Sequence, residues 1–510
     1  MKWILALAPV MLFAGWSTPV TVQEATNEQS DPKISANSSD EVLFTWNSDS
    51  IDIVQGSSYN PTTGEWSTAI DVSDSAFETA NDNVAINTDG IGVAVWRTSA
   101  SLGALPETAA STYTQGAWSV PEILSSAQEN VNRVELSSSG SGNAFAVWSA
   151  GGNGTVRNAI YNFSTNTWSA TTTVSAQGDD AREPSVSANS SNKAIIGYQD
   201  FTIGSSVVKT IIYNGSSWSS PAAISSVSRD SEDIFVAINE SNVMAAAWVG
   251  TDGDNEFATV SINSSGSWST PVELSTSSNV YQPRIVVDSS GNAYAFWGET
   301  DGSDGYLKSS IYTASSDSWS TATNISEETG ASPTEFSPVV SSSDIVYIAW
   351  QNQGSGSPTY SVLASRYVGG AWESPTQLNT AGTEGFVPVL TAGANGKIFA
   401  GWGSLPNLQS SLLSMDSSIY TPSVSMPTGG RIITQKNQVV LLWNSVEEAT
   451  SYNIYQGSTS NLIGSVSSDA QLRFVAPLYG YKSPAIYIIR AVDSGGVESS
   501  SVTLRTGGNK

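Results

Sequence analysis

The feature that most constrains this chain is a pair of aromatic anchors that recurs with a period of about fifty residues. The first anchor is a tryptophan followed by serine or, once, by glutamate, and the second closes a short apolar run 29 to 31 residues later. Units of this length made of short strands cannot bury their apolar faces alone, so each must pack against its neighbours. The first anchors are Trp16, Trp66, Trp118, Trp168, Trp218, Trp268, Trp319 and Trp372, and the second anchors are Trp46, Trp96, Trp148, Tyr198, Trp248, Trp297, Trp350 and Trp402.

Within one period the sequence predicts four antiparallel strands. In the sixth repeat these are residues 282–291, 292–297, 305–314 and 318–325, separated by Ser, Gly, Asn and Asp turns. Four-stranded units repeated around an axis are typical of a β-propeller. We therefore expect an all-β chain with an eight-bladed propeller over residues 15–420.

The two ends of the repeat array predict how the ring closes. The last repeat has no tryptophan-serine strand after Trp402, whereas the segment from Gly15 to Val20 copies the fourth-strand pattern seen around Trp268. We expect residues 16–22 to pair with the third strand of the last blade, at about residues 409–414. This pairing would leave no open edge at the closure.

Missing residue types exclude several chemistries. The 510-residue chain contains no Cys and no His, which excludes disulfides, thiolate nucleophiles, Ser-His-Asp triads and histidine-bound zinc. The net charge is -26, with -28 on residues 1–420 and +2 on the remainder. Because nucleic-acid binding needs clustered cations, nucleic acid is not an expected partner.

The N-terminus predicts export. Lys2 precedes the apolar run from Trp3 to Ala14, which is too short to span a bilayer. We expect residues 1–14 to be a signal peptide, with the mature protein periplasmic, on the cell surface or secreted. No later segment is apolar and long enough for a transmembrane span.

A second domain follows the repeats. Residues 421–430 are rich in Pro, Gly and Ser and are a predicted linker. Residues 431–510 resemble a fibronectin type III domain, through Trp443, Tyr452, Tyr455 and Tyr487 with the strand that ends at Asp493. The resemblance implies a β-sandwich that acts as a spacer or an adhesive module.

The repeats themselves resemble Asp-box and related propellers of sialidase-like and lectin-like exported proteins. The turns before Trp218 and Trp268 occupy the place of the Asp-box turn between the third and fourth strands, but Asn or Ser replaces its aspartate. Only Asp317, near Trp319, retains it. The resemblance implies the fold rather than a reaction, and no Tyr-Glu pair of the sialidase type can be assigned.

Residues that depart from the repeat predict a ligand site. They lie in the loops or first positions that enter the first strand of successive blades, at one face of the ring. Arginines there would bind a carboxylate or sulfate and aromatic rings would stack on a sugar or peptide, unless the arginines pair only with neighbouring carboxylates. The candidates are Arg133, Arg182, Glu183, Arg229, Asp233, Tyr281, Arg284, Phe336 and Phe386.

Two further interpretations stay open. Asp252, Asp254 and Glu256, and likewise Asp301 and Asp304, have spacings that could bind calcium, although solvated turns explain them better. No other cofactor is expected. The anchor aromatics could stack on sugars, but a ring at a fixed place in every repeat is most simply packed between blades.

The composition favours an exported recognition or adhesion protein without enzymatic activity, which binds a glycan or a protein on one loop face. The alternative is a glycan-processing enzyme, a sialidase-like hydrolase or a lyase, that uses carboxylates and arginines at the same face. A structural envelope protein is a third reading. The absence of histidine and of an assignable nucleophile favours the first.

Overall fold

A computed structural model shows an all-β protein, with one short 3-10 turn at Ala394–Gly396. It describes residues 15–24, 29–49, 51–74, 77–99, 101, 103–126, 129–151, 154–202, 204–226, 229–275, 279–300, 304–326, 332–354, 359–405, 414–421, 430–435, 438–444, 449–456, 461–468, 472–477, 486–493 and 502–505. The predicted signal peptide and most of the predicted linker lie outside these residues.

Residues 15–421 form eight antiparallel sheets, numbered here in chain order from the sheet that contains β3. Their first strands are β3 (Gln29–Ala36), β8 (Phe77–Ile86), β13 (Val131–Ser138), β18 (Ala181–Ala188), β22 (Asp230–Ile238), β26 (Val280–Val287), β31 (Ser332–Val340) and β36 (Glu384–Ala392). The second strands are β4 (Val42–Ser48), β9 (Gly92–Ser99), β14 (Asn143–Ala150), β19 (Ala194–Asp200), β23 (Met244–Thr251), β27 (Ala293–Thr300), β32 (Val346–Gln353) and β37 (Ile398–Leu405).

The third strand of each sheet pairs with short outer pieces. The third strands are β5 (Ile53–Asn60), β10 (Glu107–Thr114), β15 (Thr155–Asn162), β20 (Val207–Tyr213), β24 (Glu256–Asn263), β28 (Gly305–Thr313), β33 (Tyr360–Val368) and β38 (Ser414–Thr421). The outer pieces are β6 (Glu65–Trp66), β7 (Ile70–Asp71), β11 (Ala117–Trp118), β12 (Glu122–Ile123), β16 (Thr167–Trp168), β17 (Thr172–Thr173), β21 (Ala222–Ala223), β25 (Val272–Glu273), β29 (Ser318–Trp319), β30 (Thr323–Asn324), β34 (Ala371–Trp372) and β35 (Thr376–Gln377).

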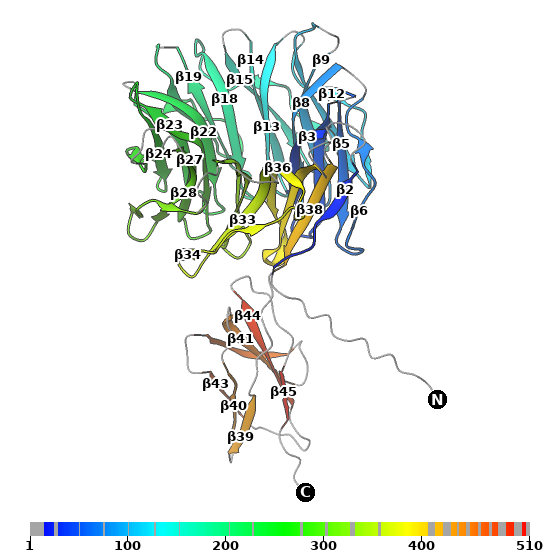
Figure 1. The fold of residues 1–510 in the computed structure, drawn as a ribbon, viewed down its shortest axis with the longest axis vertical. Helices are drawn as coiled ribbons and strands as arrows, with labels where there is room; N and C mark the ends of the chain where they lie inside the picture. Colours follow the sequence, from blue (N-terminus) through cyan, green and yellow to red (C-terminus); the bar gives the residue numbers. More distant parts are fainter. Residues whose placement is uncertain are drawn as a thin grey trace.

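The eight sheets close into a ring. Each first strand contacts the first strand of the next sheet, and β36 of the eighth sheet contacts β3 of the first. Figure 1 shows the gold strands of the eighth sheet beside the blue strands at the start of the chain. Four-stranded units that pack side by side around an axis define a propeller-like fold.

The N-terminal segment completes the eighth sheet. Strands β1 (Gly15–Trp16) and β2 (Val20–Gln23) pair antiparallel with β38, where Trp16 lies opposite Tyr420 and Val20 opposite Ser417. The predicted pairing of the N-terminal strand with the third strand of the last repeat is therefore confirmed. The predicted position of that partner, residues 409–414, is wrong, because the third strand begins at Ser414.

A hydrogen bond of the serine side chain explains why serine follows the first anchor in seven of the eight repeats. The serine backbone N–H still donates to a carbonyl of the third strand, and the serine side chain accepts a hydrogen bond from the backbone N–H of the same third-strand residue. In the fifth sheet Ser269 Oγ accepts from Ile262 N at 3.1 Å. The same bond recurs in seven of the eight sheets, at Ser17, Ser67, Ser119, Ser169, Ser219, Ser269 and Ser320.

Serine and threonine side chains also join the first strands of neighbouring sheets. Ser337 Oγ accepts a hydrogen bond from Leu390 N at 2.9 Å, and Thr391 Oγ1 accepts one from Ala36 N at 3.1 Å across the closure. A first strand has no further strand beside it, so its N–H groups need other partners. These bonds give the inner edge part of the pairing that a fifth strand would supply.

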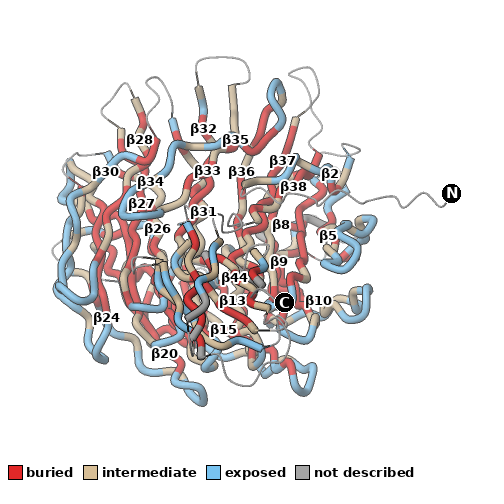
Figure 2. Tube along the Cα trace, turned by 90° about the horizontal axis from the view of Figure 1, so that it is seen from below, coloured by how far each residue is buried: buried red, intermediate tan, exposed pale blue. Residues whose placement is uncertain are grey.

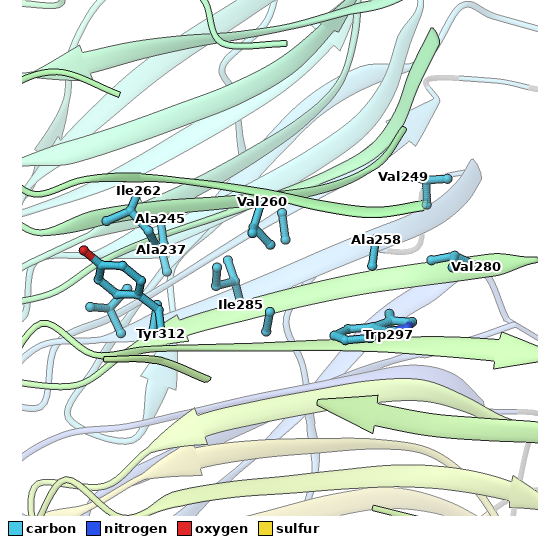
Figure 3. Packing of buried hydrophobic residues seen from close by; sticks show 14 residues of the cluster. Ala237, Ala245, Val249, Ala258, Val260, Ile262, Val280, Ile285, Trp297 and Tyr312 are labelled. Carbon is cyan, nitrogen blue, oxygen red and sulfur yellow. The ribbon is translucent and has the colours of Figure 1, made fainter. Parts of the chain in front are cut away.

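The apolar core lies between the sheets. All eight second anchors are at most 1% exposed, and the first anchors are half-buried. Figure 2 shows buried residues along the strands and exposed residues on the turns. Figure 3 shows one such interface, where Val260 of the fifth sheet lies near Ile285 and Trp297 of the sixth. The predicted inter-sheet role of the second anchors is confirmed by their burial.

The C-terminal residues form two further sheets. One contains β39 (Arg431–Gln435), β40 (Gln438–Leu442) and β43 (Arg473–Pro477). The other contains β42 (Leu462–Ser467), β41 (Ala449–Gln456), β44 (Ile486–Asp493) and β45 (Val502–Arg505). A cluster of buried residues that includes Trp443, Tyr452 and Tyr487 draws on both sheets, and the Trp443 and Tyr452 rings lie 5.4 Å apart.

Candidate functional site

A cavity of about 680 Å³ receives residues from all eight sheets. Sites for small ligands typically measure roughly 300 to 1,000 Å³, so this cavity has the size of one. Each first strand contributes to the wall, and β9 adds one arginine. The lining residues are Asp31, Lys33, Asn83, Arg97, Asn132, Arg133, Val134, Glu135, Glu183, Phe235, Arg284, Glu335, Phe336, Ser337, Pro338, Val387, Pro388 and Val389.

The backbone of the first strands explains why these residues share one wall. Every first strand has a register shift against its second strand. The shift ends at the first-strand residue that lies opposite the second anchor or opposite the residue before that anchor. Glu183 and Glu335 lie at such shifts with φ of 47° and 53°. A β-bulge turns side chains away from the regular alternation. Sequence periodicity did not reveal this bulge, and it missed Lys33 of β3 and Arg97 of β9 as lining residues.

Arg133 bridges two carboxylates at the cavity. Its Nε donates to Glu135 Oε1 at 2.7 Å, and its Nη1 donates to Glu183 Oε2 at 3.0 Å in the next sheet. The charge of Glu135, together with these hydrogen bonds, raises the pKa of Arg133 above its usual value. The charge of Arg133 is therefore shared by two carboxylates, unlike that of the other cavity arginines.

Arg284 is held differently. Its guanidinium lies over the ring of Phe235, 5.1 Å from the centroid, and Nη1 donates to the Pro283 carbonyl at 2.9 Å. No carboxylate of the described residues forms an ion pair with it. Burial lowers the pKa of Arg284, and the nearby charge of Arg133 lowers it further. The charges of Glu135, Asp233 and Glu335 raise the pKa again but only in part, so the surroundings of Arg284 do not fully offset the cost of burying its charge.

Two other cations face the cavity without a carboxylate partner among the described residues. Arg97 is half-buried, and its Nε donates to the Val131 carbonyl at 2.9 Å. Lys33 is also half-buried and has no described hydrogen bond or ion pair. Both therefore keep donors that the described residues do not use.

Four of the nine predicted ligand residues line the cavity, namely Arg133, Glu183, Arg284 and Phe336. Of these, Phe336 is buried and presents little of its ring. The structure thus brings together two of the predicted arginines, from the third and sixth sheets.

The other five predicted residues are not among the lining residues. Arg182 is exposed, pairs with Asp180 at 2.6 Å and lies over Phe201. Arg229 pairs with Glu273, and Asp233 is exposed. Tyr281 packs between the sixth and seventh sheets and donates its hydroxyl proton to the Pro333 carbonyl at 2.9 Å; Phe386 packs on Tyr360, with centroids 5.1 Å apart. Of the predicted residues, Arg284 therefore lines the cavity, whereas Arg182, Tyr281 and Phe386 are not among its lining residues.

A buried carboxyl lies behind the cavity wall. Asp82 is fully buried at a position where the other first strands have Pro, Val, Ile or Phe, and it accepts a 2.6 Å hydrogen bond from Thr45 Oγ1. Burial raises the pKa of Asp82 to about 6, partly countered by the charge of Lys33. Its other oxygen, Oδ1, has no hydrogen-bond partner among the described residues.

The calcium expectation remains a prediction. Asp252 and Asn255 form a turn, in which Asp252 Oδ1 accepts from Asn255 N at 3.1 Å. In the part of the chain that the structure describes, no group of three or more acidic side chains is placed to hold a metal ion. Residues 301–303 lie outside that part.

Taken together, the ring of sheets and its central cavity define an all-β, propeller-like protein whose cavity wall carries both acidic and basic side chains. Among the described residues, no helix has the length and apolar character needed to cross a bilayer. No protein-family model matches the sequence, and no curated protein matches it.

Solved structures give distant likenesses. The Dos1 propeller is 10% identical with a TM-score of 0.47, and the alignment covers 79% of this chain and 94% of that one. The polysaccharide lyase Uly1 is 10% identical with a TM-score of 0.44, covering 70% and 91%. An intramolecular trans-sialidase from Ruminococcus gnavus is 10% identical with a TM-score of 0.37, covering 67% and 94%. At this distance, the function of the present chain has to be inferred from its own residues.

Proposed function

We propose that this chain is an exported saccharide-binding protein, in which the eight sheets are the blades of a propeller and the ligand occupies the central cavity. The observation that carries the proposal is a cavity of about 680 Å³ to which every sheet of the ring contributes. Small molecules bind in concave sites of this size, whereas adhesive contacts between proteins use broader surfaces. The cavity therefore favours a small-molecule ligand.

The wall chemistry supports a saccharide. Phe235, Val134 and Val387 offer apolar side chains, while Asn83, Asn132 and Ser337 offer hydrogen-bonding groups to the same space. Saccharides present both apolar ring faces and hydroxyl groups, so they use both kinds of contact. The two C-terminal sheets fit the predicted fibronectin type III domain, which would act as a spacer or a second contact.

The test is binding of the full mature chain to an oligosaccharide array, followed by titration calorimetry. Asn132→Trp places a large ring at an exposed position of the cavity wall and should abolish binding. Val120→Trp is the control, since Val120 is 86% exposed and lies outside the wall. Binding that Asn132→Trp leaves unchanged, or no binding to any saccharide, would contradict the proposal.

A glycan-processing enzyme is the second candidate, because carboxylates from four sheets reach the cavity: Asp31, Glu135, Glu183 and Glu335. Glycosidases act through two carboxyl groups that flank the scissile bond. Arg133 holds Glu135 and Glu183, so Asp31 and Glu335 are the pair we assign to this candidate. Release of product from array ligands, lost in Glu335→Gln with binding kept, would support it.

A further inference from the structure

The cations of the ring divide into two groups. Its eight sheets contain twelve lysines and arginines, and eight of these form an ion pair with a carboxylate. Within the described residues the remaining four, Lys33, Arg97, Lys193 and Arg284, form none, and all but Lys193 line the central cavity. The chain has 46 Asp and Glu residues against 20 Lys and Arg, so carboxylate partners are abundant. The unpaired cations are therefore concentrated at one place.

Such an arrangement costs free energy in the empty protein. A partly buried cation without a counter-charge loses hydration that nothing replaces. At Arg284 the effect is visible in the lowered pKa, and the neighbouring Arg133 adds repulsion. The charges of Glu135, Asp233 and Glu335 act in the opposite direction, but none of these carboxylates forms an ion pair with Arg284 and the pKa stays lowered.

We propose that Lys33, Arg97 and Arg284 form an anion-recognition site, and that the saccharide in the cavity carries a carboxylate or sulfate group. This inference rests on the proposed saccharide binding. Each guanidinium uses a described hydrogen bond only to a backbone carbonyl, so it retains donors for two-point contact with an oxyanion. Phe235, which supports Arg284, holds the guanidinium plane at the wall.

The binding test compares acidic oligosaccharides with neutral ones of the same backbone: digalacturonate and galactose 6-sulfate against galactobiose and galactose, and every such pair on the array. The saccharides that the wild-type chain binds most tightly should be acidic. Tighter binding of the uronate or of the sulfate ester would identify the anionic group as a carboxylate or a sulfate. Arg284→Gln and Arg97→Gln should each weaken acidic binding at least tenfold. Arg182→Gln is the matched control, because Arg182 is exposed, pairs with Asp180 and lies outside the cavity.

A second readout separates recognition from a structural role. Because the unpaired charge is costly, Arg284→Gln should leave the unfolding midpoint of the unliganded chain unchanged or raise it. Sodium sulfate stabilises proteins generally, so its effect is compared with that of sodium chloride at equal ionic strength for each variant. The wild type should show an additional rise in melting temperature with sulfate that Arg284→Gln lacks.

The outcomes distinguish this inference from the function on which it rests. Neutral saccharides that bind as tightly as their acidic counterparts, blocked by Asn132→Trp, would overturn the anion site and leave saccharide binding intact. Equal losses in Arg182→Gln and Arg284→Gln would also overturn it, because general surface charge would then explain the preference. A lower unfolding midpoint in Arg284→Gln would assign the residue a structural role. No binding to any saccharide would overturn both proposals.

Discussion

The ammonium group of Lys397 lies 2.6 Å from Oδ2 of Asp40, a residue 357 positions earlier in the chain. Asp40 Oδ1 also accepts a 2.6 Å hydrogen bond from Ala394 N, and the carboxylate is buried. This contact joins the eighth sheet to the first at the turns between their first and second strands. Together with the pairing of β1 and β2 on β38, it fastens the closure of the ring.

Asp40→Ala should lower the free energy of unfolding by about 1.5 to 3 kcal/mol, the usual worth of a hydrogen bond to a charged group. Asn192→Ala is the matched control. Asn192 occupies the same turn of the fourth sheet, also with positive φ, but its side chain has no described hydrogen bond. Because both substitutions place alanine in the same backbone conformation, urea unfolding of the two variants isolates the closure contact. Equal losses would show that the contact contributes nothing specific.

Removal of residues 15–23 should expose the edge of β38 and cause self-association. Strand β38 would then lack the partner that Trp16 and Val20 provide. Light scattering coupled to gel filtration measures the effect, and a chain lacking only residues 1–14 is the control. A shortened chain that remains monomeric with an unchanged unfolding midpoint would show that the closing strand is dispensable.

Trp248→Ala should destabilise the chain by ~3 to 5 kcal/mol, the range for a large buried aromatic. Trp248 is 1% exposed and packs against Ile195 and Val208 of the fourth sheet. Trp268→Ala should cost less, because Trp268 is half-buried. Denaturant unfolding of both variants provides the comparison. A loss below about 1 kcal/mol at Trp248 would mean that the ring is not a core anchor.

Asp82 should make the chain less stable as the pH rises from about 4 to 6. Its pKa of about 6 in the folded protein exceeds the unfolded value of about 3.9, because burial disfavours the charge. Below pH 4 the carboxyl is protonated in both states and has no effect. Above pH 6 folding must accommodate the charge, at a cost of about 3 kcal/mol.

Asp82→Asn removes this titration and keeps a group that can accept from Thr45. The difference in unfolding free energy between the variant and the wild type should therefore be small at pH 4 and should favour the variant at pH 7. Urea unfolding at both values measures it. A difference that does not change with pH would contradict the assignment of a raised pKa to Asp82.

The repeat predicted much of the fold because its physical causes are local. The strands of the sixth sheet, β26 to β30, overlap the four segments predicted for residues 282–325. The second anchors are buried because each unit carries a large aromatic ring, and these rings are removed from water where neighbouring sheets pack together. The short outer pieces of each sheet were predicted as one strand. The strand is interrupted near the serine whose side chain bonds to the third strand. That bond depends on side-chain geometry across two strands.

The candidate site was predicted only in part. Arg133, Glu183, Arg284 and Phe336 were recognised as departures from the repeat, and all four line the cavity. Lys33 and Arg97 were missed, because nothing local distinguishes them from cations that pair elsewhere. Arg182 and Arg229 have the same sequence signal as Arg284, but Asp180 and Glu273 lie within reach of them.

The sequence alone therefore determined that the chain repeats, that each unit is a small sheet with two aromatic anchors, and that the N-terminal segment belongs to the last unit. These follow from periodicity and from the need of each apolar face for a neighbour. The tertiary structure decided which cations keep a carboxylate and which face the cavity without one. Whether a cation is paired depends on the bulges of the eight first strands, which line the central cavity, and on distances between residues of different sheets. No local sequence pattern encodes these distances.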